Sequence, residues 1–311
     1  MGEIISSEEP LTKDYVPEEM LFRENELRML RELIKLGANV FIYGPSGSGK
    51  TLLVKKTLES LPHTAAFYLD CSLYQTVNAI LREILWDKLV FSRSNYDLLK
   101  KLSEKARKSK FIVCLDNAEE LKELDAIEKL MAIGLTVIVV AQKKEVYEAL
   151  HPRARSMITE VLELKPYTQE QIFEILRKRA YQSLSSRCFN EELLEKIAAR
   201  SKGNASLAIN TLRSCALRAE LRGDRMISEE LVNTVVNQLD CPARLNDDEK
   251  LLLEILSKNK RMKAGQLYEL YYSLATQPKE ERTFRKYMRR LCTLGLVRAR
   301  GEKRGRVYEI L

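Results

Sequence analysis

One run of eight residues has the types and spacing needed to hold a phosphate chain. Gly44 to Thr51 read Gly-Pro-Ser-Gly-Ser-Gly-Lys-Thr, which is the spacing G-x-x-x-x-G-K-T. Its glycines let backbone N–H groups curl around phosphate oxygens, and the N-terminus of the following helix adds partial positive charge. We expect Lys50 to reach the β- and γ-phosphates and the Thr51 hydroxyl to ligate Mg²⁺. The motif predicts a site for ATP or ADP with Mg²⁺ at Gly44, Pro45, Ser46, Gly47, Ser48, Gly49, Lys50, Thr51 and Leu52.

An acidic residue at the end of a neighbouring strand should help to hold the metal ion. The apolar run 111–115 is followed by Asp116, which suits this role. Many ATPases of this architecture place a Glu directly after that residue to orient the attacking water, whereas this chain has Asn117. An amide can hold a water but cannot take its proton, so we expect tight nucleotide binding with weak or absent hydrolysis. Glu119 could substitute, although a solvated charge at the start of a helix is the simpler interpretation.

The last quarter of the chain carries the excess positive charge. Lys and Arg outnumber Asp and Glu by 52 to 44, and residues 241–311 alone contain 17 basic and 9 acidic residues. The preceding 240 residues are therefore neutral overall. This distribution suggests one module that meets a polyanion.

Apolar spacing in this basic segment predicts helices over 247–256, 263–272 and about 281–294, then strands over 296–300 and 306–310 joined by a glycine-bracketed tip. This is the winged-helix order, in which the third helix enters the major groove and the hairpin reaches phosphates or the minor groove. A merely solvated basic face is the alternative, but helix and tip are both rich in cations. We expect contacts with double-stranded DNA from Arg282, Arg285, Lys286, Arg289, Arg290, Arg298, Arg300, Lys303, Arg304 and Arg306.

The phosphate motif needs a sheet to hold it, and the sequence predicts a parallel one. Strand-length apolar runs at 38–43, 65–70, 111–115, 135–141 and 161–164 alternate with helical stretches, which is typical of an α/β sheet covered on both faces. The segment 76–108 is long for one crossover and predicts an inserted helical hairpin. After Pro166 only helical spacing remains, over 169–184, 191–201, 206–221 and 228–238.

These patterns predict an α/β plus α protein of three units, which are a nucleotide-binding domain over about 1–166, a helical lid over 167–240 and a winged helix over 241–311. Residues 1 to about 17 read as a polar arm lying on the first domain. No apolar run reaches the roughly 18 residues of a membrane helix, and no secretory signal is visible. The scattered cysteines and two histidines argue against a zinc site or a disulfide framework. We expect a cytoplasmic, nucleoid-associated protein without a membrane partner.

The order of these parts resembles the archaeal relatives of the origin-recognition and cell-division-cycle replication initiators, which join an AAA+ domain, a lid and a winged helix. The resemblance covers nearly the whole chain. Its most specific stretches are Tyr15-Val16-Pro17-Glu18 with Phe22-Arg23-Glu24, the motif 44–51, Leu69-Asp70-Cys71, residues 150–156, residues 165–168 leading to 175–180, and Gly295-Leu296-Val297.

The resemblance implies several roles. Tyr15, Val16, Arg23 and Tyr167 would lie at the nucleotide, and Gln142 would occupy a sensor position. Arg153 or Arg155 would be an arginine finger acting across a subunit contact. A helical hairpin within about 72–99 would match a DNA-contacting insertion. Duplex origin DNA would be the ligand, and other initiator subunits or a replicative helicase would be partners.

Three departures from the family pattern surround the γ-phosphate. Asn117 replaces the usual Glu, Gln142 replaces the usual sensor Asn, and Ser206 stands where the lid usually offers a sensor Arg. The residues 44–51 and Asp116 remain intact. The sequence therefore predicts a divergent paralogue that uses bound ATP or ADP as a structural or conformational element rather than turning it over.

Four functions remain open from the sequence. A replication initiator and a transcription regulator with a nucleotide-sensing ATPase domain would use the same winged helix, and a footprint beside an origin or a promoter would separate them. A motor such as a helicase loader needs repeated hydrolysis, which Asn117 disfavours. A signalling ATPase whose C-terminal unit binds protein would show no salt-dependent affinity for DNA.

Overall fold

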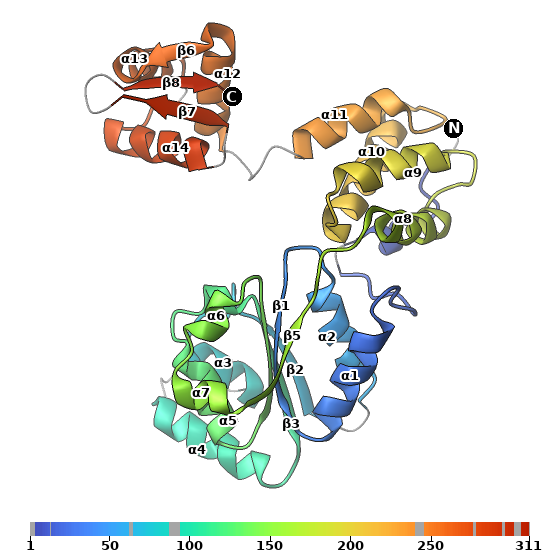
Figure 1. The fold of residues 1–311 in the computed structure, drawn as a ribbon, viewed down its shortest axis with the longest axis vertical. Coiled ribbons are helices and arrows are strands. Elements are labelled where there is room, and N and C mark those ends of the chain that lie inside the picture. Colours follow the sequence, from blue (N-terminus) through green and yellow to red (C-terminus); the bar gives the residue numbers. More distant parts are fainter. Residues whose placement is uncertain are drawn as a thin grey trace. The chain divides into compact units, whose positions relative to one another are not determined.

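The computed structural model describes residues 4–12, 14–61, 65–86, 94–239, 246–275, 278–293, 296–301 and 306–310. The chain divides into two compact units, Met1–Val236 and Asn237–Leu311 (Figure 1). The first unit contains a sheet domain followed by a helical lid, and the second is a small helix-and-strand unit. In the part of the chain that the structure describes, no helix has both the length and the apolar character needed to span a bilayer.

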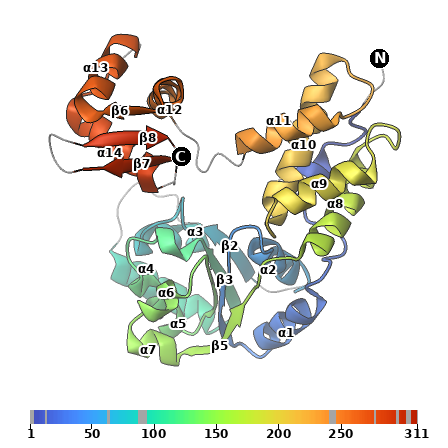
Figure 2. The same cartoon turned by 45° about the horizontal axis from the view of Figure 1, so that its top comes forward.

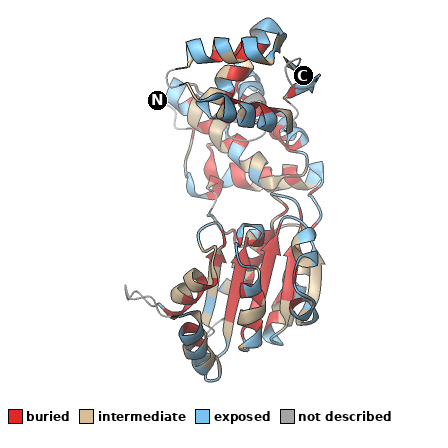
Figure 3. Cartoon of the chain, turned by 90° about the vertical axis from the view of Figure 1, so that its left-hand side faces the viewer, coloured by how far each residue is buried: buried red, intermediate tan, exposed pale blue. Residues whose placement is uncertain are grey.

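Five parallel strands form the sheet of the first unit. They lie in the order β2-β3-β4-β1-β5, and all five strands predicted from the sequence are present with ends shifted by at most three residues. The inner strands are nearly continuous apolar runs because helices cover both faces, and their buried residues form the red core of the sheet in Figure 3. The strands are β1 (Asn39–Tyr43), β2 (Ala65–Asp70), β3 (Phe111–Asp116), β4 (Thr136–Ala141) and β5 (Ile158–Glu163).

Parallel pairing brings the carboxyl ends of these strands to one edge. Asp70 is the register partner of Asp116 on β2 and β3, and Tyr43 is the partner of Ala141 on β1 and β4. Residues that follow β1, β3 and β4 therefore share this edge. The strand that ends at Asp116 is not the direct neighbour of β1 that the sequence analysis expected, because β4 lies between β1 and β3.

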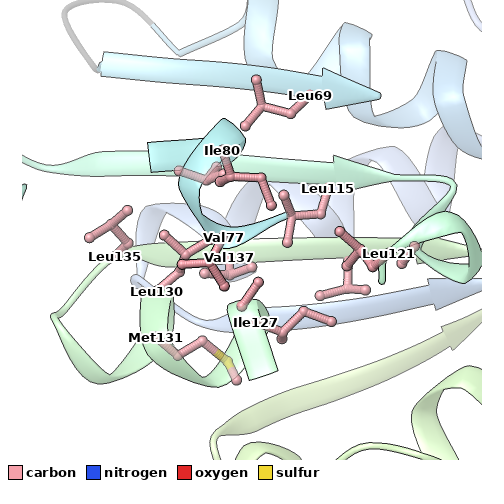
Figure 4. Close-up of a cluster of buried hydrophobic side chains, with 14 of the residues drawn as sticks. Leu69, Val77, Ile80, Leu115, Leu121, Ile127, Leu130, Met131, Leu135 and Val137 are labelled. Carbon is pink, nitrogen blue, oxygen red and sulfur yellow. The ribbon is translucent and has the colours of Figure 1, made fainter. Parts of the chain in front are cut away.

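Helices pack on both faces of the sheet (Figures 1 and 2). One face carries α1 (Glu24–Lys35) and α2 (Lys50–Glu59), and the other carries α3 (Val77–Leu85), α4 (Asn95–Ala106) and α5 (Asp125–Ala132). Figure 4 shows Ile80 of α3, Leu115 of β3 and Ile127 of α5 in the hydrophobic core on the face that α3, α4 and α5 cover. The helices α3 and α4 form the predicted hairpin, but residues 87–93 between them lie outside the described residues.

The lid has the four helices that its apolar spacing predicted, which are α8 (Gln169–Ser183), α9 (Glu191–Arg200), α10 (Ala205–Arg222) and α11 (Glu229–Leu239). Side chains close the helix starts, since Thr168 forms a capping box with Gln171 and Asn204 accepts a hydrogen bond from the Leu207 N–H at 2.9 Å. Gly223 ends α10 with a φ of 74°, in the left-handed region that favours glycine.

The N-terminal arm lies on the lid, which corrects the expectation that it lies on the sheet domain. Ile4 is 0% exposed, and its carbonyl accepts a hydrogen bond from the Ser185 N–H at 3.0 Å. The Arg179 guanidinium donates to the Pro10 carbonyl at 3.1 Å, so α8 holds the arm at a second point. The arm looked polar in the sequence, but a few apolar residues at wide spacing complete the lid core. Only from Met20 does the chain enter the core of the sheet domain.

The second unit has the winged-helix arrangement. Its helices are α12 (Asp247–Asn259), α13 (Ala264–Leu274) and α14 (Glu281–Thr293), and its hairpin is β7 (Val297–Arg300) with β8 (Val307–Ile310). A short strand that the sequence did not reveal, β6 (Arg261–Lys263), completes a sheet of order β6-β8-β7. Only one of its three residues is even half-buried, so it carries no apolar alternation.

An ion pair fastens α14 to α12. The Glu249 side chain is 0% exposed, and Arg290 donates to both of its carboxylate oxygens at 3.1 Å. Glu249 also closes the capping box of α12 by accepting from the Asn246 N–H at 3.0 Å. Arg290, which the sequence assigned to the DNA-contacting face, therefore also holds the framework of its own unit.

Arg290→Ala is expected to loosen both helices, because it leaves a buried carboxylate without its cation. Arg290 still reaches water, so we expect a loss of about 1–2 kcal/mol, less than for a fully buried pair. Hydrogen exchange of α12 and α14 amides should become roughly 5- to 30-fold faster. Lys286→Ala, on the exposed face of α14, is the control, and equal exchange in the two variants would contradict the expectation.

Candidate functional site

The glycine-rich loop leaves the end of β1 and enters α2 at Lys50. A side chain at Gly44 would place its Cβ 2.2 Å from the Leu164 carbonyl oxygen, and one at Gly49 would place it 2.7 Å from the Tyr167 hydroxyl. The loop is therefore packed against its surroundings so closely that only glycine fits. The Ser48 hydroxyl is buried and lacks a hydrogen-bond partner among the residues described. A cradle with an unsatisfied buried hydroxyl suits a phosphate group.

Lys50 lies within this loop. Its ammonium donates to the carbonyls of Gly44 at 2.6 Å and Pro45 at 2.9 Å. Burial lowers the pKa of Lys50, and the negative charges of Asp116 and Glu119 act in the opposite direction. The cation predicted to reach phosphates is thus held at the loop, between backbone oxygens and two carboxylates.

Asp116 collects hydrogen bonds from three elements. Its side chain is buried, and its Oδ2 accepts from the Thr51 hydroxyl of α2 and the Tyr68 hydroxyl of β2, each at 2.6 Å. Its Oδ1 accepts from the Asn117 backbone N–H at 2.9 Å. The structure therefore brings together Thr51 and Asp116, the pair predicted to hold Mg²⁺. A hydroxyl beside a carboxylate offers the oxygen ligands that Mg²⁺ prefers, so this donor set fits the ion.

Asn117 is paired with a carboxylate that the sequence reasoning did not assign to the site. Its side-chain amide donates to Asp70 Oδ1 at 2.9 Å, and the Ser72 backbone N–H donates to the same oxygen at 2.9 Å. An ionised carboxylate only accepts hydrogen bonds, so the Asn117 NH₂ faces Asp70 and the amide oxygen points elsewhere. The signal that could have revealed Asp70 is its position, because it ends the strand beside the one that Asp116 ends.

Glu119 reaches across the same edge. It lies in the 3-10 turn η2 (Ala118–Glu120), and its Oε2 accepts from the backbone N–H of Gln142, the residue after β4, at 3.3 Å. Its charge also acts on Lys50. The interpretation of Glu119 as a charge that only meets solvent therefore leaves out its position between the predicted sensor residue and the loop lysine.

The lid touches the glycine-rich loop directly. The Ala205 N–H at the start of α10 donates to the Gly47 carbonyl at 3.1 Å. Asn204, which caps α10, fills the space beside Gly47. A Cβ added to Gly47 would lie 1.9 Å from the Oδ1 of Asn204. Two helix N-termini, those of α2 and α10, thus meet at the loop, and both favour a negative charge there. Ser206, in the place of the usual sensor Arg, is exposed in the first turn of α10.

The residues predicted around the base divide into two places. The Arg23 guanidinium stacks on the Tyr167 ring at 4.4 Å and also bonds the Lys165 carbonyl, while the Tyr167 hydroxyl lies beside Gly49. Tyr15 instead stacks on the Arg179 guanidinium of the lid, with 4.4 Å between the ring centroid and the guanidinium carbon. Val16, the next residue, is half-buried. Arg23 and Tyr167 are therefore near the loop, and Tyr15 lies toward the lid.

Arg153 and Arg155, the predicted arginine fingers, lie in α7 (Pro152–Ser156). The Arg153 Nε lies 3.6 Å from the Glu128 carboxylate of α5. Both helices contribute to the core on the sheet face opposite α2. The structure does not bring these arginines to the loop of their own chain, and their action on a second subunit stays a prediction.

The winged-helix unit exposes a basic surface. Cations stand exposed along α14 and continue on β7 and at the start of β8. Some are held by acids within the unit, since Arg285 pairs with Glu281 at 2.7 Å and Arg300 with Glu309 at 3.3 Å. The exposed predicted contacts are Arg282, Arg285, Lys286, Arg289, Arg290, Arg298, Arg300 and Arg306, whereas Lys303 and Arg304 lie outside the described residues.

Two stretches of the chain match known family models. Residues 34–150 match the AAA domain, and residues 173–237 match the Cdc6 AAA+ ATPase-type lid domain. ORC1-type DNA replication protein 1 of Sulfolobus acidocaldarius is 27% identical to this chain, over 98% of the chain and 88% of that protein. ORC1-type DNA replication protein 2 of Methanothermobacter thermautotrophicus is 28% identical, over 83% of the chain and 78% of that protein.

Solved structures share the fold. The Aeropyrum pernix ORC1 protein in complex with DNA matches with a TM-score of 0.76 at 22% identity, over 100% of this chain and 94% of that one. Cdc6p from Pyrobaculum aerophilum matches with a TM-score of 0.69 at 24% identity, over 99% of this chain and 94% of that one. The Aeropyrum pernix ORC2 protein, solved as ADPNP–ADP complexes, matches with a TM-score of 0.64 at 21% identity, over 99% of this chain and 94% of that one. The predicted architecture of an AAA+ domain, a lid and a winged helix is confirmed.

Gly47→Ala is expected to separate the lid from the loop, because the new methyl group would overlap Asn204. Its φ of 75° adds a backbone strain of about 1 kcal/mol for any larger residue. Gly134→Ala is the matched control, since its φ is 88° but nothing lies within 4 Å of the added Cβ. Unfolding in urea should show a larger loss for Gly47→Ala by at least about 1 kcal/mol. Equal losses would mean that Asn204 does not pack on the loop.

Proposed function

We propose, because this chain belongs to the archaeal ORC1/Cdc6-type AAA+ family, that it is a replication-initiator protein whose bound nucleotide controls its hold on duplex DNA. The observation that carries the proposal is the meeting of the loop lysine, Thr51, Asp116 and the α10 N-terminus at one strand edge. The same chain ends in a winged helix with an exposed basic face.

The nucleotide would be ATP or ADP with Mg²⁺. Backbone N–H groups of the loop and Lys50 would bind the phosphates, and Thr51 and Asp116 would hold the metal. Mg²⁺, when bound, would neutralise phosphate charge. The Aeropyrum pernix ORC2 structures, solved as ADPNP–ADP complexes, support a nucleotide in this fold. The contact of Gly47 with α10 gives the nucleotide a route to the lid, since both border the phosphate cradle.

Hydrolysis would be weak. Asn117 cannot take a proton from water, and the Ser206 hydroxyl carries no charge for a γ-phosphate. Asp70 is ionisable but is occupied by the Asn117 amide and the Ser72 N–H. Of the two carboxylates that act on Lys50, Asp116 would hold the metal ion, and Glu119 would be left to act on the lysine. Bound nucleotide would therefore act chiefly as a conformational element.

A paired substitution tests this account of hydrolysis. Asn117→Glu alone sets a second carboxylate against Asp70, whereas Asp70→Asn with Asn117→Glu restores an amide beside a carboxylate. We expect slow single-turnover hydrolysis of ATP by the wild type, little gain from either single substitution, and a gain of about tenfold or more in the double variant. A wild-type rate on the order of 1 s⁻¹, as in ordinary enzymes, would contradict weak hydrolysis. A double variant no faster than Asn117→Glu would contradict the role given to Asp70.

Duplex DNA would be bound by the winged helix, with α14 in the major groove and the hairpin at the phosphates or the minor groove. The relatives are DNA replication proteins by name, and the Aeropyrum pernix ORC1 structure is a complex with DNA. These names favour a replication origin over a promoter as the DNA that the protein binds. Its protein partners would then be other initiator subunits or a replicative helicase. Such a protein would be cytoplasmic and associated with the nucleoid.

Replacing Arg282, Lys286 and Arg289 together by Ala tests the DNA surface, because these residues share one exposed stripe of α14. The affinity for labelled duplex, measured by fluorescence anisotropy at several salt concentrations, should fall at least about tenfold, and the salt slope should become smaller by up to about 3. The control replaces Arg187, Arg222 and Arg225, which are exposed on the lid and remove the same charge. Equal losses in both variants would mean that net charge, not the winged helix, decides binding.

A further inference from the structure

Tyr68 of β2 is aimed at the carboxylate proposed to hold the metal ion. Its hydroxyl donates to Asp116 Oδ2 at 2.6 Å, the same oxygen that accepts from Thr51 at 2.6 Å. Neither the glycine-rich motif nor the strand that ends at Asp116 contains Tyr68, so the two patterns that predicted the site gave no sign of it. The contact exists because β2 pairs with β3 in parallel and places Tyr68 beside Cys114.

The three donors on Asp116 fix its orientation. Two hydroxyls fasten Oδ2 and one backbone N–H fastens Oδ1, so the buried carboxylate cannot rotate without breaking a short hydrogen bond.

A cation of α2 also lies over the ring of Tyr68. The Lys55 ammonium of α2 lies 5.2 Å from the ring centroid, and it pairs at 3.5 Å with Asp14, where the N-terminal arm passes toward the sheet domain. Lys55 follows Thr51 by one turn of α2. Tyr68 is therefore linked to this helix directly through Lys55, and indirectly through Asp116, which also bonds Thr51.

We propose that Tyr68 is a positioning residue for the metal-bound nucleotide: it holds Asp116 Oδ2 against Thr51, so that the hydroxyl and the carboxylate stand ready to receive Mg²⁺. This inference rests on the proposed binding of nucleotide. Tyr68 touches neither phosphate nor metal in this account and acts through Asp116. Preorganisation of this kind lowers the cost of ordering the ligands when the ion binds.

The test is the effect of Mg²⁺ on nucleotide affinity, measured with a fluorescent, non-hydrolysable ATP analogue in the full chain, with Mg²⁺ and with EDTA. Tyr68→Phe removes the hydroxyl and keeps the ring. We expect it to reduce the gain in affinity from Mg²⁺ by about fivefold or more, which corresponds to about 1 kcal/mol, while the affinity in EDTA stays unchanged. Tyr74→Phe is the matched control, because that hydroxyl bonds Glu83, away from Asp116.

A double-variant comparison separates positioning from general packing. In an Asp116→Ala background, Tyr68→Phe should have no further effect on the response to Mg²⁺, because the residue acts through Asp116. An unchanged response to Mg²⁺ in Tyr68→Phe would overturn the proposal while leaving nucleotide binding intact. Equal losses of affinity with Mg²⁺ and EDTA would also overturn it, since they show a structural role. Wild-type protein that binds no nucleotide in either condition would overturn the proposed function as well.

Discussion

The buried carboxylate of Asp116 joins the parts of the proposed nucleotide site. It accepts hydrogen bonds from a hydroxyl of α2, a hydroxyl of β2 and the backbone after β3, so these three elements meet at one side chain. A carboxylate in this surrounding is stable only while its donors stay in place, because an unpaired buried charge is costly. The parallel register that aligns the ends of β2 and β3 is the condition for this arrangement.

The connection from this site to the rest of the first unit runs through Gly47. The loop carbonyl and the α10 N–H form a hydrogen bond, and Asn204 packs where a larger residue would have its side chain. The lid is in turn bound to the N-terminal arm, which returns to the sheet domain at Met20. A phosphate that changes the loop conformation would therefore act on linked contacts between the loop, the lid, the arm and the sheet domain. For the nucleotide to control the protein, two arrangements of these parts must differ in their affinity for the phosphate chain.

Much of this was predictable from the sequence because it depends on local patterns. The strands are apolar runs, the lid helices have regular spacing and the phosphate motif has a fixed length. The placement of the arm was not predictable, since Ile4 and Leu11 show no periodicity. Ile4 bonds the segment after α8, and the turn that contains Leu11 packs against α8 and α10, all of them far along the chain. Tyr68 and Asp70 were missed for a related reason. The roles of Tyr68 and Asp70 depend on which strands pair, and a single sequence does not show which strands are neighbours in the sheet.

The pairing of Asp70 with Asn117 changes how the departure at position 117 is understood. A Glu at this position would stand against Asp70, and two carboxylates sharing one site cannot both remain ionised without cost. The amide avoids this repulsion and forms a hydrogen bond instead. Asn117 and Asp70 are therefore one feature, in which the acid lies on β2 and the amide after β3. The Asp70 carboxylate remains at the strand edge, where it accepts hydrogen bonds from the Asn117 amide and the Ser72 N–H, and this pairing supports the weak hydrolysis proposed for the site.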